Sequence, residues 1–518
     1  MPAQHPSIIA ACAAHAAANP ERPCLIWEGQ TLSYGQLAGL ASGYATRYRE
    51  LGVTPGARVA LFLPSSPSFV AAYLGAHAAG AAAVLVNTQY RQVELRHILG
   101  DSAPQLVVTD AAGAAELGGL LDELPGPTRL LLLDPYRHEP WAVGTLAGPF
   151  PAPHELAVLA YTSGTTGRAK GAMLTHGSLA ANSAAVAQAW RWTAADHLLL
   201  TLPLFHIHGL GVGLHGTLLA GASLELRPRF DAAEVLDSLA SNTHTLFFGV
   251  PTLYTRLIAE AQSRLSDNQA SPSGYRLSAR ALRAASPGYR LFVCGSAPLS
   301  PQTFAAFEEL FGQRILERYG MTETGMNLTN PYDGERRPGS VGAPFLGQAA
   351  RVVEPRTRAE LPDGSVGEIE VRGPHVCAGY WRNPAATAEV FHADGWFSTG
   401  DLGWRSADGY YTLTGRAKEL IISGGYNIYP RELEELLLEH PEVQECAVIG
   451  MPDPDFGEQV VAVIVPTNPA QPPTPEELAA FCRERLAAYK RPRAIYYVAA
   501  LPRNALGKVE KHRLKGGL

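Results

Sequence analysis

Short apolar runs alternate with longer patterns of helical spacing along most of the chain. Runs rich in leucine and β-branched residues occupy positions 58–63, 83–86, 105–109, 197–202, 223–226, 245–250 and 290–294. A helical pattern over 66–80 separates the first two of these runs. Strands that alternate with helices are typical of crossover units, which build largely parallel sheets. The pattern therefore predicts an α/β fold.

After Pro338 the spacing of turn signals changes. Strand-like runs at 350–353 and 368–371 are short and lie between glycine- and proline-containing turns, which favours an antiparallel or barrel-like section. We expect residues 1–417 to form a large N-terminal domain of parallel-rich sheets wrapped by helices, with the barrel-like section included.

From Lys418 onward the sequence predicts a small α+β domain. Pro430 opens a helical pattern, and strand-like runs follow at 447–449, 460–465 and 495–498. A second helix is expected to begin with a capping box at 474–477 and to continue to about Ala488. We expect residues 418–518 to form a mobile C-terminal lid domain.

The composition excludes several classes of protein. The chain has 518 residues, of which 46% are hydrophobic and 17% charged, so a large core is expected and a disordered, solvated chain is excluded. Lys and Arg number 42 against 48 Asp and Glu, a net charge of −6. Without a basic excess, nucleic acid is not an expected partner. Local cations would have to bind any anionic substrate.

The cysteines and the N-terminal segment indicate a cytoplasmic protein. The 6 cysteines form no Cys-x-x-Cys pair and have no zinc-finger spacing with histidine, so buried reduced thiols are expected. The first Lys or Arg is Arg22, which leaves no basic start for a secretory signal. No strongly apolar run reaches the roughly 18 residues of a membrane span, so none is expected.

A glycine- and threonine-rich segment follows the apolar run 156–159. Its sequence at 161–171 is Tyr-Thr-Ser-Gly-Thr-Thr-Gly-Arg-Ala-Lys-Gly. Glycines allow the backbone to approach a phosphate, hydroxyl and amide groups donate to its oxygens, and Lys170 supplies charge. The segment lacks the Gly-Lys-Ser/Thr ending of a Walker A loop, and taken alone it is also compatible with a plain turn.

Further motifs follow this loop in a fixed order. They are Arg-Tyr-Gly-Met-Thr-Glu-Thr at 318–324, Ser-Thr-Gly-Asp at 398–401, Gly-Arg-Ala-Lys-Glu at 415–419, Ser-Gly-Gly-Tyr-Asn-Ile-Tyr-Pro at 423–430 and Pro-Arg-Asn-Ala-Leu-Gly-Lys at 502–508. Together with the loop, the set resembles the superfamily of acyl-CoA synthetases, adenylation domains and luciferases over essentially the whole chain. The resemblance implies an ATP-dependent acid–thiol ligase. A carboxylate would attack the α-phosphate of ATP to give an acyl-adenylate and pyrophosphate, and the thiol of CoA would then displace AMP.

The resemblance also implies roles for individual residues of an ATP site. Thr322 would contact the α-phosphate, and Glu323 would bind Mg²⁺. Asp401 would bind the ribose hydroxyls, and Lys508 would bridge the carboxylate and the α-phosphate, because two anions that meet need screening by cations. The expected catalytic residues are Lys170, Thr322, Glu323 and Lys508. The expected ATP-binding set is Thr162, Ser163, Gly164, Thr165, Thr166, Gly167, Lys170, Ser296, Ala297, Pro298, Glu317, Arg318, Tyr319, Gly320, Met321, Thr322, Asp401, Arg416 and Lys508.

The second step implies a CoA site and a movement. The expected CoA-binding residues are Gly424, Gly425, Tyr426 and Lys490, since the family uses the glycine pair to line a pantetheine tunnel. A solvated basic edge explains Lys490 equally well. Lys418 stands where the family places the hinge between domains. The context of Lys508 also resembles that of lysines modified by protein acetyltransferases, which makes such an enzyme an expected partner.

The acyl pocket is expected to form from segments 204–209, 250–256, 294–298 and 318–326. Its expected substrate-binding residues are His208, Arg256, Ser296, Arg318 and Met326. Relatives that adenylate amino acids place an aspartate near the first segment, where it binds the ammonium group. This chain has His206 and His208 there instead, which argues against an amino acid as the substrate. If that segment were a strand, both imidazoles would point the same way and could bind zinc. No third ligand is apparent, so packing or substrate contact is the preferred interpretation.

Arg256 and Arg318 favour a short dicarboxylate as the acid. Unpaired guanidinium groups would strongly destabilise an apolar tunnel, whereas a second substrate carboxylate could pair with them. Residues 317–327 and 330–336, and also 206–209, resemble malonyl-CoA synthetases, which implies malonate, with methylmalonate as a second substrate. The alternative substrate is a medium-chain or aromatic acid, in which case the arginines would pair with internal carboxylates such as Glu317. The alternative functions are a non-catalytic regulator that binds an adenylate and a light-producing oxygenase.

Overall fold

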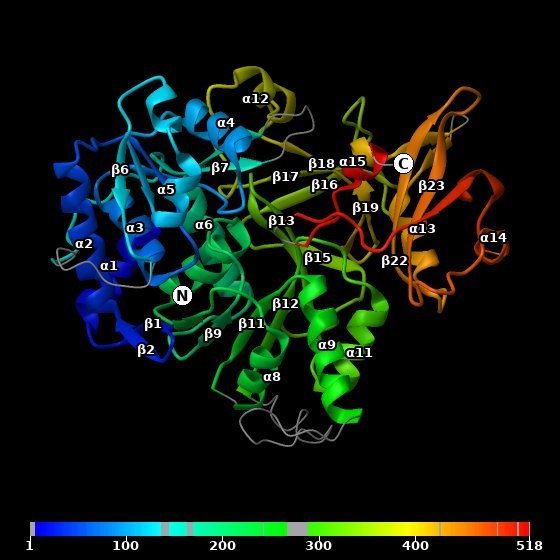
Figure 1. Cartoon of the computed structure of the whole chain (residues 1–518), viewed down its shortest axis with the longest axis horizontal. Helices are drawn as coiled ribbons and strands as arrows, with labels where there is room; N and C mark the ends of the chain where they lie inside the picture. Colours follow the sequence, from blue (N-terminus) through cyan, green and yellow to red (C-terminus); the bar gives the residue numbers. More distant parts are fainter. Residues whose placement is uncertain are drawn as a thin grey trace. The chain divides into compact units, whose positions relative to one another are not determined.

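The computed structural model describes residues 6–135, 144–162, 169–241, 243–266, 288–423, 426–483, 485–504 and 507–516. Contacts divide the chain into two compact units (Figure 1). The first unit comprises Met1–Pro338, Gly342–Ala349 and Val371–Phe397, and the second comprises Gly339–Val341, Ala350–Glu370 and Ser398–Leu518. The predicted α/β organisation is confirmed, while a domain boundary between residues 417 and 418 stays a prediction.

One mixed sheet of the first unit has the strand order β6-β5-β3-β4-β7-β8. Neighbouring strands are parallel except for the antiparallel pair β7 and β8. The strands are β3 (Arg58–Phe62), β4 (Ala82–Leu85), β5 (Leu106–Thr109), β6 (Arg129–Leu132), β7 (Leu156–Thr162) and β8 (Lys170–Thr175). The strands predicted at 58–63, 83–86 and 105–109 are therefore confirmed.

A second series of paired strands in this unit has the order β14-β13-β12-β11-β9-β10-β1-β2. The pairs from β13 to β1 are parallel, and β14 and β2 pair antiparallel at the two ends. The bounds are β1 (Pro23–Trp27), β2 (Gln30–Ser33), β9 (His197–Leu200), β10 (Ser223–Leu226), β11 (Leu246–Gly249), β12 (Leu291–Cys294), β13 (Leu316–Met321), β14 (Gly325–Thr329) and, antiparallel to β14, β15 (Ser340–Pro344).

Several helices of the first unit begin at a capping side chain. Ser66 accepts a hydrogen bond from the amide of Phe69 at 3.1 Å at the start of α3 (Pro67–Ala78), and Pro67 occupies its first turn. Ser33 and Gln36 form a capping box for α2 (Tyr34–Glu50). The others are α1 (Ile8–Ala18), α4 (Gln92–Ser102), α5 (Ala111–Leu117), η1 (Leu120–Glu123), α6 (His176–Ala189), η2 (His208–Leu214), α7 (His215–Ala220), α8 (Ala232–Ser241), α9 (Pro251–Ser266), α11 (Pro301–Phe311) and α12 (Pro384–Val390).

The alanine-rich stretch around α3 forms a buried helix that packs on α2. Every residue from Pro67 to His77 is buried. A Cβ atom at Gly75 would lie 2.4 Å from Cβ of Tyr44, so glycine allows the two helices to approach closely. Among the residues that the structure describes, none of the helices is both long enough and apolar enough to cross a bilayer.

The second unit holds two groups of strands. One has the order β16-β17-β18-β19, and the other β21-β20-β23-β22 with β24 paired to β23. Their bounds are β16 (Ala349–Val353), β17 (Gly367–Arg372), β18 (Phe397–Arg405), β19 (Tyr411–Arg416), β20 (Ile421–Ser423), β21 (Tyr426–Ile428), β22 (Val443–Asp453), β23 (Gly457–Pro466) and β24 (Ala494–Tyr497). The helices are η4 (Ala417–Glu419), α13 (Pro430–Leu437), α14 (Pro475–Arg483), η5 (Ala488–Lys490) and α15 (Lys511–Lys515).

The capping box predicted for α14 is present. Oγ1 of Thr474 accepts from the amide of Glu477 at 3.2 Å, and Oε2 of Glu477 accepts from the amide of Thr474 at 2.7 Å. The predicted end of this helix is wrong, because α14 ends at Arg483 and Ala488 begins the separate turn η5.

Candidate active site

A hairpin between β13 and β14 carries Thr322 and Glu323 in its turn. Asn182 of α6 holds the hairpin from the side, because its Nδ2 donates to the carbonyl of Met326 at 2.8 Å and its Oδ1 accepts from the amide of Met326 at 3.1 Å. Gly325 has a φ of 63°, and a Cβ atom there would lie 2.5 Å from Oδ1 of Asn182. Glycine is therefore required beside the turn.

The carboxylate of Glu323 is held by two hydroxyl groups from distant parts of the first unit. Oγ1 of Thr162 donates to Oε1 at 3.2 Å, and the hydroxyl of Tyr380 donates to the same oxygen at 3.0 Å. Glu323 is buried. Both bonds fall on Oε1, so neither engages Oε2. A carboxylate oxygen beside a threonine hydroxyl fits Mg²⁺.

Tyr380 reaches Glu323 because its segment pairs with β8. Tyr380 forms an antiparallel bridge with Ala172, and the amide of Trp381 donates to the carbonyl of Gly171 at 2.8 Å. Nζ of Lys170, at the start of β8, lies 5.3 Å from the centre of the Tyr380 ring, within the range of a cation–π interaction. One tyrosine therefore contacts both the predicted metal ligand and the predicted phosphate-binding lysine.

The predicted phosphate loop falls mostly outside the described residues, since Ser163, Gly164, Thr165, Thr166 and Gly167 are not among them. The residues at its two ends are described. Thr162 ends β7, Lys170 begins β8, and the two are partners in the antiparallel register. Thr162 also donates to Glu323, so the ends of the loop lie beside the hairpin turn.

Arg318 of β13 is a buried guanidinium with no carboxylate within ion-pair distance among the described residues. It packs on Gly295, where a Cβ atom would lie 2.6 Å from Cζ. Its Nη2 lies 3.5 Å from Oγ of Ser296, and its Nε has no hydrogen-bond partner in the described part of the chain. Burial lowers the pKa of Arg318 to about 10, which leaves it charged at neutral pH. A buried cation in this state is strongly destabilising until an anion pairs with it.

Ser296 joins Arg318 to His208. Ser296 has a φ of 70°, a left-handed conformation that is uncommon for residues with side chains. Its Oγ lies 3.2 Å from Nδ1 of His208, and Nε2 of His208 is buried without a hydrogen-bond partner among the described residues. Burial and the nearby Arg318 hold the pKa of His208 well below its usual range, so this imidazole is neutral.

Residues 206–208 do not form the strand on which the zinc alternative depended. His208 begins the π-helical turn η2, and its amide donates to Nδ1 of His206 at 3.1 Å. A Cβ atom at Gly209 would lie 2.3 Å from the carbonyl of Pro203, so the glycine allows a tight turn instead of an extended chain. The alternating geometry on which a zinc pair depended is therefore absent.

The structure places the two predicted substrate arginines on different elements, Arg256 on α9 and Arg318 on β13. Arg256 is exposed on α9, whose buried residues are Tyr254, Leu257, Ile258, Ala261 and Arg264. Within the described ranges it has no hydrogen bond or ion pair to Ser296 or Arg318. Of the remaining predicted residues, Glu317, Tyr319, Gly320 and Met321 lie on β13 with Arg318, Ala297 and Pro298 follow Ser296, and the buried Met326 lies on β14.

In the second unit, Asp401 and Arg416 face each other across β18 and β19. The two residues are partners in the antiparallel register, and Nε of Arg416 lies 3.0 Å from Oδ1 of Asp401. The side chain of Asp401 is largely buried. The two residues predicted to contact ribose thus form one ion pair.

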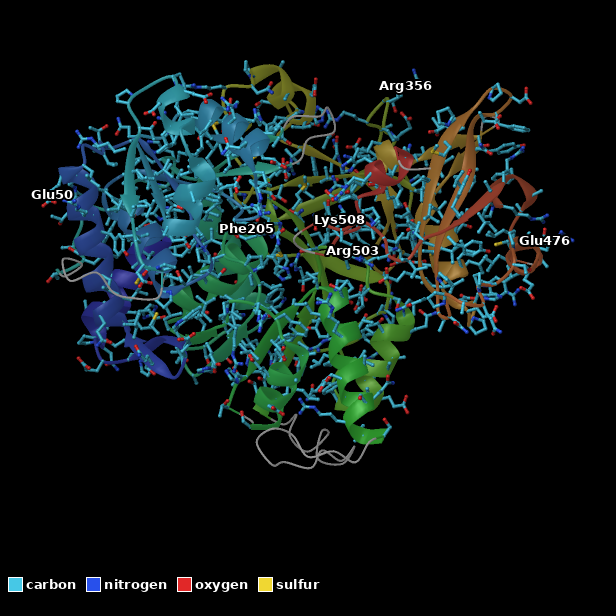
Figure 2. All side chains as sticks on the ribbon, viewed as in Figure 1. Glu50, Phe205, Arg356, Glu476, Arg503 and Lys508 are labelled. Carbon is cyan, nitrogen blue, oxygen red and sulfur yellow. The ribbon has the colours of Figure 1, made fainter. Side chains whose placement is uncertain are left out.

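Lys508 lies in the second unit, next to Val509, which forms a bridge with Arg503. The amide of Lys508 donates to Oδ1 of Asn504 at 3.0 Å. Figure 2 labels Lys508 and Arg503 next to each other. Burial, followed by the charge of Arg416, lowers the pKa of the Lys508 ammonium group, while Asp401 acts in the opposite direction. Three of the predicted nucleotide-site residues therefore share one electrostatic environment.

The predicted CoA segment is described in part. Gly424 and Gly425 lie outside the described residues. Tyr426 begins β21, is exposed, and stacks on Tyr489 with ring centres 4.4 Å apart. Nζ of Lys490 lies 2.6 Å from Oε1 of Glu432, so it already has an anionic partner. The predicted hinge residue Lys418 is exposed on η4.

Two residues that hold this site were not identified from the sequence. Asn182 carries a weak signal, as a polar residue within the otherwise largely apolar buried face of α6. Tyr380 carries none, because it lies outside every motif and meets Glu323 only through the pairing of its segment with β8.

Comparisons with known proteins agree with this arrangement. Residues 12–381 match the AMP-binding enzyme family, and residues 432–508 match the AMP-binding enzyme C-terminal domain. The chain is 38% identical over 517 residues to a sulfoacetate–CoA ligase of Cupriavidus necator, covering 98% of this chain and 97% of that protein. It is 35% identical to a malonate–CoA ligase of Arabidopsis thaliana, covering 95% of this chain and 85% of that protein.

A solved structure shares the fold over nearly the whole length. ATP-bound MatB from Rhodopseudomonas palustris is 37% identical, with a TM-score of 0.89 and 98% of each chain covered. Both family matches, in the order that the sequence motifs predict, account for most of the chain. The chain therefore belongs to the AMP-binding enzyme family and is an ATP-dependent, AMP-forming acyl-CoA ligase.

Proposed function

We propose that this ligase joins malonate to CoA through a malonyl-adenylate and accepts methylmalonate as a second substrate. The observation that carries the proposal is the state of Arg318. This guanidinium is buried, charged and without a carboxylate partner among the described residues. A second carboxylate on a short acid supplies the missing anion in a geometry that arginine binds well.

The groups around Arg318 also suit a short and polar acid. Oγ of Ser296 and Nε2 of His208 offer a hydroxyl and a neutral imidazole within the same cluster. The pairing of Arg318 with Glu317, considered as an alternative, is not among the ion pairs of the described residues. A long apolar or aromatic chain would leave the charge of Arg318 uncompensated at a cost of several kcal/mol.

In the adenylation step, an oxygen of the substrate carboxylate attacks the α-phosphorus of ATP and the bond to pyrophosphate breaks. We assign Mg²⁺ binding to Glu323, phosphate binding to Thr322 and to the loop that ends at Lys170, and ribose binding to Asp401 with Arg416. Mg²⁺ supplies charge neutralisation at the phosphates. Lys508 stabilises the charge that develops between the carboxylate and the α-phosphate.

In the thioester step, the thiol of CoA attacks the acyl carbon and AMP leaves. We assign CoA binding to the segment with Gly424, Gly425 and Tyr426, and also to Lys490. Lys490 would then have to leave its ion-pair partner Glu432. Lys418 is assigned as the hinge that exchanges Lys508 for this segment. Acetylation of Lys508 by an acetyltransferase stays a prediction from its sequence context alone.

A second candidate substrate is sulfoacetate. The 38% identity to a sulfoacetate–CoA ligase favours it, and its sulfonate group would present an anion to Arg318 as the distal carboxylate of malonate does. Malonate and sulfoacetate share the feature that the site requires, a second anionic group close to the reacting carboxylate.

Pyrophosphate release with ATP, Mg²⁺ and CoA tests the proposal. Malonate, methylmalonate, sulfoacetate, succinate, acetate, octanoate and ferulate are compared, and the thioester is identified by mass spectrometry. Malonate is expected to give the highest kcat/KM. Preference for sulfoacetate would transfer the proposal to the second candidate, and preference for acetate, octanoate or ferulate would contradict the anion-binding role of Arg318.

A further inference from the structure

Three side chains of metal-ligating types converge on neighbouring parallel strands of the first unit, and none of them is among the residues discussed above. His197 begins β9, Glu225 lies on β10, and His244 precedes β11 (Figure 1 labels β9 and β11). β9 pairs with both β10 and β11, and Ser223 is the register partner of His197. Because residues two apart on a strand share a face, Glu225 lies on the same face as Ser223.

The ligand atoms of this cluster are close together. One nitrogen of each histidine and one carboxylate oxygen of Glu225 all lie within 4.8 Å of one another. Nε2 of His244 lies 3.0 Å from Oε2 of Glu225, and the two imidazole rings have centres 4.4 Å apart. His244 is buried, whereas Glu225 keeps 22% of its side chain exposed. The cluster is therefore compact and still reachable from solvent.

Each of the three side chains also has a hydrogen-bond partner outside the cluster. Oγ of Ser223 lies 3.0 Å from Nδ1 of His197, and Oγ1 of Thr243 lies 3.0 Å from Nδ1 of His244. Nε of Arg227 donates to Oε1 of Glu225 at 2.7 Å. Metal-binding histidines and carboxylates are commonly fixed in this way by outer partners, which orient the remaining atom toward the ion.

We propose that His197, Glu225 and His244 bind a zinc-class divalent cation that cross-links β9, β10 and β11. Two imidazoles and one carboxylate, with a water as the fourth ligand, satisfy the tetrahedral preference of Zn²⁺. Mg²⁺, which prefers oxygen ligands, is a poor match for two nitrogen ligands. The site is separate from the Mg²⁺ position assigned to Glu323 and does not rest on the proposed substrate.

The competing explanation is a metal-free network. The pair of His244 with Glu225 and the contact of Arg227 with Glu225 would stabilise the same three strands without an ion. The positive charge of Arg227 also balances the negative charge of the Glu225 carboxylate. The two explanations differ in whether the protein binds a divalent ion at this cluster, because the metal-free network needs none.

The test uses Co²⁺ as a coloured substitute for Zn²⁺ on the full-length protein after removal of metals with a chelator. We expect one Co²⁺ per chain, a visible absorption band of a low-coordinate cobalt centre, and loss of that band on addition of one equivalent of Zn²⁺. At Zn²⁺ concentrations about 100-fold above the dissociation constant, the melting temperature is expected to rise by about 2–5 °C.

His197→Gln and His244→Gln are expected to abolish the cobalt band and the rise in melting temperature. The matched control is His154→Gln, at an exposed histidine outside the cluster, which should bind cobalt as the unchanged protein does. Pyrophosphate release by each variant checks that it has folded. If folded His197→Gln and His244→Gln bind cobalt with the original spectrum, or the unchanged protein binds none, the metal-free network is correct and the proposal is overturned.

Discussion

The hydroxyl of Tyr380 donates a 3.0 Å hydrogen bond to Oε1 of Glu323, which lies 57 positions earlier in the chain. The ring of the same tyrosine lies 5.3 Å from Nζ of Lys170. Neither contact is local in sequence. Tyr380 therefore acts as a positioning residue, because it orients the carboxylate assigned to Mg²⁺ and packs beneath the lysine assigned to phosphate.

Tyr380→Phe should separate these two contacts, since it removes the donor to Glu323 and keeps the ring beneath Lys170. A hydrogen bond to a charged group contributes about 1.5–3 kcal/mol, so kcat for pyrophosphate release should fall about tenfold to 150-fold. The Mg²⁺ concentration needed for half-maximal rate should rise. Initial rates measured over a range of Mg²⁺ concentrations check both effects.

The control for this variant is Tyr496→Phe, at a tyrosine that is 41% exposed in the second unit. It should leave the rate and the Mg²⁺ dependence unchanged. A Tyr380→Phe enzyme with normal Mg²⁺ dependence would show that Glu323 needs no orientation by this hydroxyl.

Arg318→Met should raise the KM for malonate and leave the KM for ATP nearly unchanged. Loss of a charge-assisted hydrogen bond predicts about a tenfold to 150-fold increase. Gly295→Ala should have a smaller effect in the same direction, because a Cβ atom would lie 2.6 Å from Cζ of Arg318. Steady-state kinetics with malonate and with ATP as the varied substrate measure both constants.

Stability distinguishes this role from a structural one. If Arg318 serves the substrate, its replacement removes an unpaired buried charge and the melting temperature should stay the same or rise. Breaking a buried ion pair would instead lower stability by about 3–5 kcal/mol. Arg356→Met, at an exposed arginine of the second unit labelled in Figure 2, serves as the control. A large loss of stability with an unchanged KM for malonate would contradict the substrate role.

Local sequence signals were sufficient for much of the fold. The capping box at 474–477 marked the start of α14, because a cap acts on amides only three residues away. The alternation of apolar runs with helical patterns indicated parallel strands, since a parallel connection needs an intervening crossover. The end of α14 was misplaced, because helix ends depend on contacts beyond the local pattern.

The candidate site was less accessible from the sequence. Motifs located Glu323 and Lys170, but Tyr380 and Asn182 join them only through contacts over long sequence separations. Arg256 was grouped with Arg318 because both are cationic residues of segments expected to form the acyl pocket. Its place on α9, between the buried positions Tyr254 and Leu257, turns it toward solvent. The direction of a side chain on a helix depends on its position around the helix axis. A short motif near the end of a strand does not carry that information.

Lys508→Gln should slow pyrophosphate release about 100-fold to 1,000-fold, the effect of removing one group that stabilises developing charge. Thioester formation from a supplied malonyl-adenylate should change much less. Burial and the charge of Arg416 lower the pKa of Lys508, so adenylation should decline with rising pH before an ordinary lysine would deprotonate. Lys508→Arg keeps its charge and should lose that alkaline decline.

The control is Lys515→Arg, at an exposed lysine of α15, which should keep the alkaline decline. Pyrophosphate release and thioester formation are measured separately between pH 7 and pH 10. Equal slowing of both steps by Lys508→Gln would contradict a role restricted to adenylation, and full activity of protein completely acetylated at Lys508 would rule out regulation by this modification.

Stability should fall as the pH drops below about 6.5, because three neutral histidines are buried together in the first unit. His77 of α3 lies 4.6 Å from His176 of α6 between ring centres, and the hydroxyl of Tyr73 lies 2.8 Å from Nε2 of His215. Burial lowers the pKa of His176 to about 4 and that of His215 to about 3, and it holds the pKa of His77 well below its usual range. In the unfolded chain each would titrate near 6.5.

The sign of the effect follows from proton binding. Between pH 6.5 and the lowered pKa values the unfolded chain binds more protons than the folded one, so the free energy of unfolding decreases by up to about 1.4 kcal/mol per pH unit for each histidine. Urea unfolding at pH 7.5 and at pH 5.0 should show this decrease, and both pH values lie above the range in which most carboxylates protonate. His215→Gln should reduce the slope, whereas His154→Gln, at an exposed site, should not. Equal stability of the unchanged protein at both pH values would mean that these histidines accept protons in the folded state, and the neutral buried cluster would have to be abandoned.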